Sequence, residues 1–131
     1  MEGQQPVEMI LLRQLASYLT VPIWMMDERG NLLYYNEPAE TLLGVRFDDA
    51  GPLHAEQLAD MFRTTDFDGE PIADVDLPVI AALTTRRPAH GQIRFRGFDG
   101  TWRDVNISAV PVEGQGNRFL GIFAAFWELE N

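Results

Sequence analysis

Apolar and polar residues follow two different periodicities along this chain, one typical of helices and one typical of strands, and the periodicity changes several times. Residues 7–19 carry apolar side chains at helical spacing, among them Val7, Ile10 and Leu15, which predicts an amphipathic helix. Residues 23–26 and 32–35 are short apolar runs that flank a turn-forming stretch at 27–31. These runs predict two paired strands that follow the helix directly.

The middle of the chain is punctuated by helix start and stop signals. Asn36 can cap a helix at 37–43, and Gly44 can end it. Residues 54–62 predict another short helix, and the acidic, turn-rich residues 63–76 predict an ordered connecting loop. Residues 77–85 predict a further helix, with Pro78 tolerated in its first turn.

The last third of the chain predicts three strands. Residues 92–97 and 102–112 alternate apolar and polar side chains around a hairpin signal at 98–101. After a second turn at 113–117, residues 119–128 are apolar on both faces, which is typical of a central strand with both sheet faces covered. Strands clustered at both ends with helices between them predict an α+β fold with a five-stranded antiparallel sheet.

Composition narrows the function classes. The length of 131 residues suits one domain, and the net charge of −10 argues against nucleic-acid or anionic-membrane binding. The chain has no cysteine, which excludes disulfides, thiolate metal sites and cysteine nucleophiles. No apolar stretch reaches the roughly 20 residues that span a bilayer, and the amino terminus lacks the basic start of a signal peptide. We therefore expect a soluble, cytoplasmic protein.

Several short elements recur in a recognisable order and spacing. They are Asp27-x-x-Gly30, Asn36-x-x-Ala39, Leu43-Gly44, Gly69-Glu70-Pro71, Asp99-Gly100, Ala109-Val110-Pro111 and Gly121. Together they make residues 21–128 resemble a PAS (Per-ARNT-Sim) sensor domain. The resemblance implies strand order 2-1-5-4-3, with helices on one face and the N-terminal helix on the other. It divides the chain into a tail and dimerisation helix at 1–20 and a PAS domain at 21–131.

The carboxyl end departs from the family pattern. Family members commonly finish the last strand with an aspartate and a helical linker to an output domain, whereas Glu128 stands here and the sequence ends at Asn131. Two interpretations remain open. The chain is either a sensor piece of a longer protein or a single-domain protein that signals by association with an output partner.

The resemblance implies a pocket between the sheet and the middle helices. By strand alternation its lining is predicted to be Trp24, Met26, Ile93, Phe95, Val105, Ile107, Ala109, Leu120, Ile122, Ala124 and Phe126, with Ile80 and Leu83 from the facing helix. Large side chains such as Trp24 favour a filled core, and small ones such as Ala124 leave room for an apolar ligand. The predicted set offers no polar group to orient a charged metabolite.

The sequence contains few residues that could hold a cofactor. Haem in such domains is held by an axial histidine, and the candidates are His54 and His90. The usual ligand position falls on residues 77–85, which contain no histidine, so two ordinary surface histidines are the favoured interpretation. Light-sensing flavin chemistry that needs a reactive cysteine is excluded, while a non-covalently bound flavin has no motif to support it. No cofactor is required and no metal site is predicted.

Catalysis is not predicted either. A small α+β fold with a cavity resembles ketosteroid-isomerase-like enzymes in size, but that chemistry needs a buried carboxylate base. The carboxylates here fall in turns or on strand edges. The main basic cluster is Arg86, Arg87, Arg94, Arg96 and Arg103. We interpret it as pairing with nearby carboxylates, with the docking of an acidic partner as the alternative.

The outward sheet face carries an apolar row that a monomer would have to cover: Ile23, Met25, Phe123, Ala125 and Trp127. The helix at 7–19 can cover part of it, and its wide apolar stripe fits either its own domain or a second copy. The predicted dimer interface is Ile10, Leu11, Leu15, Tyr18, Met25, Phe123 and Trp127.

These features favour a sensory or signalling PAS domain of a bacterial-type regulator. It would bind a small apolar ligand or transmit signals through homodimerisation. The alternatives are a ligand-free structural dimerisation module and, third, a small enzyme of the ketosteroid-isomerase-like kind.

Overall fold

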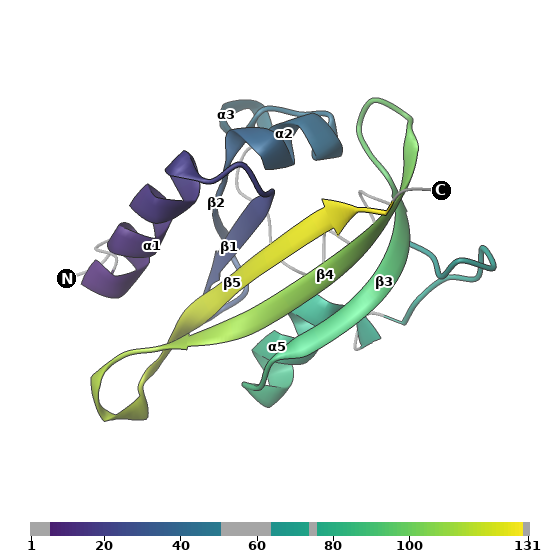
Figure 1. Ribbon diagram of the computed structural model, residues 1–131. Coiled ribbons are helices and arrows are strands. Elements are labelled where there is room, and N and C mark those ends of the chain that lie inside the picture. Colours follow the sequence, from purple (N-terminus) through teal and green to yellow (C-terminus); the bar gives the residue numbers. More distant parts are fainter. Residues whose placement is uncertain (1–5, 51–63, 74–75, 130–131) are drawn as a thin grey trace.

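The computed structural model describes residues 6–50, 64–73 and 76–129. Its elements, in chain order, are α1 (Val7–Tyr18), β1 (Ile23–Asp27), β2 (Leu32–Tyr35), α2 (Glu37–Leu43), α3 (Phe47–Ala50), α5 (Pro78–Thr85), β3 (Ala89–Arg96), β4 (Trp102–Glu113), the 3-10 turn η2 (Gln115–Asn117) and β5 (Phe119–Glu128) (Figure 1). The helix predicted at 54–62 lies outside the described residues.

The strands form one antiparallel sheet in the order β2-β1-β5-β4-β3. The predicted order is therefore confirmed, and β5 lies centrally between β1 and β4. Strand β3 begins at Ala89, three residues before the predicted start at 92. The reason is the length of β4, which still offers Ala109 and Ser108 as partners for Ala89 and His90.

The two faces of the sheet are covered by different elements. On the inner face, Trp24 and Met26 of β1 pack with α2 and α5 in the main core. On the outer face, Ile23 and Met25 pack against Met9 of α1 in a second core. Adjacent β1 residues point to opposite faces, so α1 and α5 sandwich the sheet, as Figure 1 shows.

Helix α2 begins and ends as its sequence predicts. The Asn36 side chain accepts a hydrogen bond from the Ala39 N–H at 3.2 Å, and Gly44 closes the helix in the left-handed region at φ 79°. A Cβ at Gly44 would also lie 2.8 Å from the backbone nitrogen of Asp99. Glycine therefore allows the helix end to approach the β3–β4 hairpin closely. The short helix α3 was not predicted, because four residues carry too little periodicity to be noticed.

Candidate functional site

A cavity of about 100 Å³, partly open to solvent, lies between the inner sheet face and α5. Alternate residues of the strands form its floor, and the first turn of α5 forms a wall, with further contributions from α2 and residue 64. The described lining residues are Trp24, Leu43, Thr64, Leu77, Pro78, Val79, Ile80, Ile93, Phe95, Val105, Ile107, Ala124 and Phe126. Thr64 alone among them carries a hydroxyl group, and none carries a charge.

Strand alternation and a glycine position this lining. Ile93 pairs with Val105 and Ala109 with Ala124 across the sheet, so inward side chains stand in register. A Cβ at Gly91 would lie 3.1 Å from the Pro78 ring. The missing side chain therefore lets the start of α5 pack closely over β3.

Behind the cavity wall, Tyr35 supplies a buried phenol. Its ring stacks on Trp24 with centroids 5.2 Å apart, and its hydroxyl donates a hydrogen bond to the Val45 carbonyl at 3.0 Å. Burial raises the pKa of Tyr35 to about 12, with smaller contributions from the Glu40 and Asp49 carboxylates. The phenol is therefore neutral at physiological pH and is already hydrogen-bonded, so it presents no free polar group to a ligand.

The predicted lining and the observed cavity overlap in part. Of the predicted residues, Trp24, Ile80, Ile93, Phe95, Val105, Ile107, Ala124 and Phe126 line the cavity. Met26, Leu83, Ala109 and Ile122 lie in the surrounding core instead. Sequence reasoning missed Leu43, Thr64, Leu77, Pro78 and Val79. Only the apolar end of α2 and the apolar first turn of α5 could have pointed to some of them.

The prediction that Leu120 faces inward is wrong. Leu120 is buried in the outer core with Met9 of α1, and Phe119 packs against the inner core instead. The β4–β5 register shifts between Val112 and Glu113, and Gly121 has a φ of +154°. This irregularity breaks the strict alternation at the start of β5.

The outer face of α1 carries most of the residues predicted for a dimer interface. Ile10, Leu11, Leu15 and Tyr18 are exposed, Tyr18 at 76%. On β5, Trp127 is 42% exposed and Phe123 is partly buried. Met25 is the exception, because it is 0% exposed beneath α1. It can take part in an interface only if α1 leaves the sheet.

The histidine and carboxylate positions do not assemble a reactive centre. His90 projects from the outer side of β3, with Nδ1 2.8 Å from the Ser108 hydroxyl, and it does not line the cavity. His54 lies outside the described residues. Within the described ranges, no group of three or more His, Asp or Glu side chains is placed to hold a metal. Neither the position of His90 nor the cavity's size fits a histidine-ligated haem, and the cavity is likewise small for a flavin.

Two of the five arginines of the basic cluster have carboxylate partners among the described residues. Arg94 Nε donates to Asp104 across β3 and β4 at 2.7 Å, and Arg103 lies within 4 Å of carboxylate oxygens of Asp99 and Glu128. The Arg94 hydrogen bond lowers the pKa of Asp104. These contacts support pairing with nearby carboxylates for Arg94 and Arg103, whereas Arg86 lies over the Phe119 ring.

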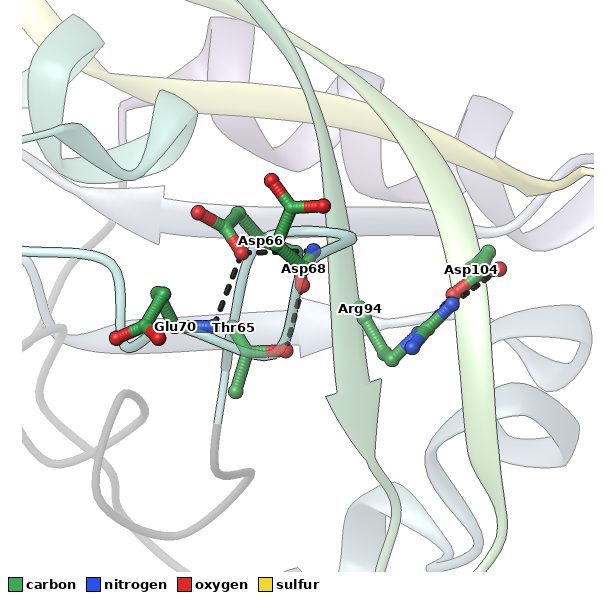
Figure 2. A network of polar contacts seen from close by, with 6 residues as sticks. All are labelled: Thr65, Asp66, Asp68, Glu70, Arg94 and Asp104. Carbon is green, nitrogen blue, oxygen red and sulfur yellow. Dashed lines mark hydrogen bonds and ion pairs between the residues drawn. The ribbon is translucent and has the colours of Figure 1, made fainter.

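The loop that supplies Thr64 is fastened to the edge of β3 next to the cavity. Thr65 exchanges two backbone hydrogen bonds with Arg94, at 2.7 and 2.8 Å. The Asp66 carboxylate accepts from the backbone N–H groups of Asp68 and Glu70 and so closes the loop (Figure 2). This pairing covers part of an otherwise open sheet edge.

Within the described residues, no helix combines the length and apolar character needed to cross a membrane.

Comparison with known proteins identifies the architecture. Residues 11–127 match the profile of the PAS fold family, while no curated protein matches the chain. The PAS domain of a protein from Colwellia psychrerythraea is 20% identical, with a TM-score of 0.67 over 93% of this chain and 97% of that one. The PAS domain of BvgS from Bordetella pertussis is 17% identical, with a TM-score of 0.64 over 95% and 87%. A LOV protein from Rhodobacter sphaeroides is 16% identical, with a TM-score of 0.75 over 96% and 70%.

Proposed function

The chain belongs to the PAS family, and on that premise we propose that it is a sensory domain whose inner cavity binds a small, neutral, apolar molecule. The observation that carries the proposal is the cavity lining, in which, among the described residues, Thr64 carries the one hydroxyl group and no side chain carries a charge. Apolar cavities in proteins stay dry and accept apolar guests, because water finds no hydrogen-bond partners there. The bound molecule would act as a signal that the domain passes to an output domain or protein.

The cavity volume limits the size of the guest. A volume of about 100 Å³ is well below the roughly 300–1,000 Å³ of pockets for drug-sized ligands. It approaches the roughly 150 Å³ of engineered apolar cavities that take up benzene or xenon. We therefore place the ligand among single rings and short hydrocarbons, and use benzene as the probe.

Two neighbouring alanines of β5 provide a matched test. Ala124 lines the cavity, whereas Ala125 packs in the outer core. Benzene at ten times its Kd should stabilise the wild type by about 1.4 kcal/mol, a rise of several degrees in Tm. Ala124→Leu should abolish the rise by filling the cavity, and Ala125→Leu should keep it. An unchanged wild-type Tm up to the solubility limit of benzene would contradict the proposal.

We also propose that the domain works as a homodimer through α1. The supporting observation is the exposed apolar row of Ile10, Leu11, Leu15 and Tyr18 on one face of α1, since monomers seldom expose an apolar patch of this kind. Analytical ultracentrifugation should give twice the 14.8 kDa chain mass. Leu11→Glu should produce monomers, whereas Gln115→Glu, which adds the same charge at the exposed turn between β4 and β5, should not. A wild-type monomer at high micromolar concentration would overturn this proposal.

The two tests also separate the alternative of a ligand-free dimerisation module. The exposed row on α1 favours dimerisation whether or not the cavity is occupied. A dimer whose stability benzene leaves unchanged would establish that alternative and remove the ligand from the account.

A further inference from the structure

A column of aromatic rings runs from the cavity wall to α1. Trp24 lines the cavity, and Tyr35 stacks on it with planes 5° apart. Phe47 meets Tyr35 edge-on at 5.3 Å and Tyr34 edge-on at 5.4 Å. The Arg13 guanidinium of α1 covers the far end, 4.7 Å from the centroid of the Tyr34 ring and 5.7 Å from that of Phe47. These rings form an unbroken contact path between the two features proposed to carry the function.

Two polar contacts hold the middle of the column in place. The Tyr35 hydroxyl donates to the Val45 carbonyl. The Phe47 backbone N–H donates to the Glu40 carboxylate at 2.6 Å, which anchors the start of α3 to α2. Because these bonds hold the Tyr35 and Phe47 rings in position, a displacement of the Trp24 ring moves Tyr35 and, through Tyr35, Phe47. Close-packed protein interiors transmit displacement in this way.

Arg13 gives α1 a contact that differs from its sheet packing. Met9 and Ala16 bury α1 against the outer sheet face, whereas Arg13 reaches past the sheet edge to rings on β2 and α3. Among the described residues, Arg13 forms no ion pair, so the two rings are its main electrostatic partners. A cation is attracted to a ring face only in a narrow range of geometries, and the fit of α1 therefore depends on where the rings lie.

We propose that this column couples the cavity to α1, so that a ligand seated against Trp24 holds α1 more firmly on the domain. The inference rests on the proposed ligand-binding function and adds the route by which ligand binding affects α1. By restraining Trp24, the ligand narrows the motion of Tyr35 and Phe47 and so steadies the ring platform beneath Arg13. Local opening of a terminal helix is a low-energy event in proteins, and a change in that opening alters the surface that α1 presents for dimerisation.

The coupling makes a reciprocal prediction. If ligand binding stabilises the docking of α1 on the domain, then a change that weakens this docking must lower the affinity for the ligand by the same factor. Coupling factors of about fivefold or more are common between linked sites. Arg13→Gln keeps a long, polar side chain but removes the cation. Phe47→Leu removes the middle ring of the column at a position that does not line the cavity. Arg87→Gln removes an equal charge from an exposed position after α5 and is the control.

Hydrogen exchange of the α1 amides, measured by NMR with and without benzene, tests the inference. In the wild type and in Arg87→Gln, benzene should slow α1 exchange about fivefold. In Arg13→Gln and Phe47→Leu, benzene should still bind, up to about fivefold more weakly, and the slowing of α1 should disappear. Equal slowing in all four proteins would overturn the proposed column.

A second comparison keeps this result distinct from a failure of ligand binding. If benzene does not bind the wild type, the cavity can instead be filled with the protein's own atoms by the Ala124→Leu substitution. Ala124→Val replaces it if the leucine variant fails to fold. The filled variant should exchange α1 amides more slowly than wild type, and adding Arg13→Gln should cancel that difference. A filled variant whose α1 slowing survives Arg13→Gln would contradict the column, whatever benzene does.

Discussion

The side-chain Nδ2 of Asn36 donates a hydrogen bond to the backbone carbonyl of Ala16 at 2.9 Å, and so joins the end of α1 to the start of α2. The same nitrogen donates to the Val21 carbonyl. The Asn36 Oδ1 accepts from the backbone N–H groups of Ile23 and Ala39. Asn36 is completely buried, and every polar atom of its amide is used. One side chain therefore fastens three elements to each other.

Substitution of Asn36 should separate its capping role from its fastening role. Asn36→Asp keeps the oxygen that accepts from Ile23 and Ala39 but turns a carboxylate oxygen toward two carbonyls. We expect α1 amides to exchange much faster and stability to fall by about 3 kcal/mol, since buried unsatisfied groups cost about 1–3 kcal/mol each. Asn36→Ala should cost at least as much, because the cap is lost too. Urea unfolding together with hydrogen exchange checks both; unchanged α1 protection in Asn36→Asp would count against the fastening role.

Asn36 also shows how far sequence reasoning reaches. Its capping of α2 could be predicted, because the cap and the helix are adjacent in sequence. Its bonds to Ala16 and Val21 could not, because they depend on how α1 returns to the sheet. The same division holds at the cavity, where strand alternation located Ile93 and Val105. Strand alternation failed at Leu120, because the backbone irregularity near Gly121 turns this side chain to the outer face of the sheet.

Gly121 should tolerate no side chain. A Cβ there would collide with the Met26 carbonyl oxygen and approach the Met9 methyl group to 2.9 Å, and its φ of +154° disfavours other residues. We expect Gly121→Ala to lower the free energy of unfolding by about 3 kcal/mol or more. Gly116→Ala is the control, because its φ of +69° is also positive but open space surrounds it. It should cost about 1 kcal/mol of strain alone; equal losses in urea titrations of the two variants would refute the steric argument.

Tyr35 should make stability fall at alkaline pH. Its folded pKa of about 12 exceeds the ordinary value of 10, so its contribution is fully present below pH 10 and is lost as the pH rises through 12. Tyr35→Phe should be about 1 kcal/mol less stable at pH 7, because the bond to Val45 is gone. The variant should show a shallower loss between pH 10 and 12. Parallel stability profiles across that window would show that Tyr35 ionisation is not the cause.

Arg94 should influence Asp104 more than it influences the loop beside the cavity. The loop is hydrogen-bonded to the Arg94 backbone, whereas the Arg94 side chain pairs with Asp104 and touches the loop only through the Phe67 ring, 5.9 Å from the guanidinium carbon (Figure 2). In Arg94→Ala the pKa of Asp104 should rise toward its ordinary value, which an NMR titration measures directly. The stability that the depressed pKa provides is present above the ordinary aspartate pKa and is lost as the pH falls through the folded value, so this acid dependence should weaken. Thr65 amide protection should persist; its loss would show that the side chain, too, holds the loop.

The most direct test of the account is a crystal structure determined under xenon pressure. Xenon is apolar and fits a cavity of this size, and its anomalous scattering locates it without interpretation of weak density. We predict a xenon atom enclosed by Trp24, Ile93, Val105 and Ala124, and none there in Ala124→Leu. An inner face that remains closed to xenon in the wild type would show that the core is filled and that this domain does not sense through its cavity.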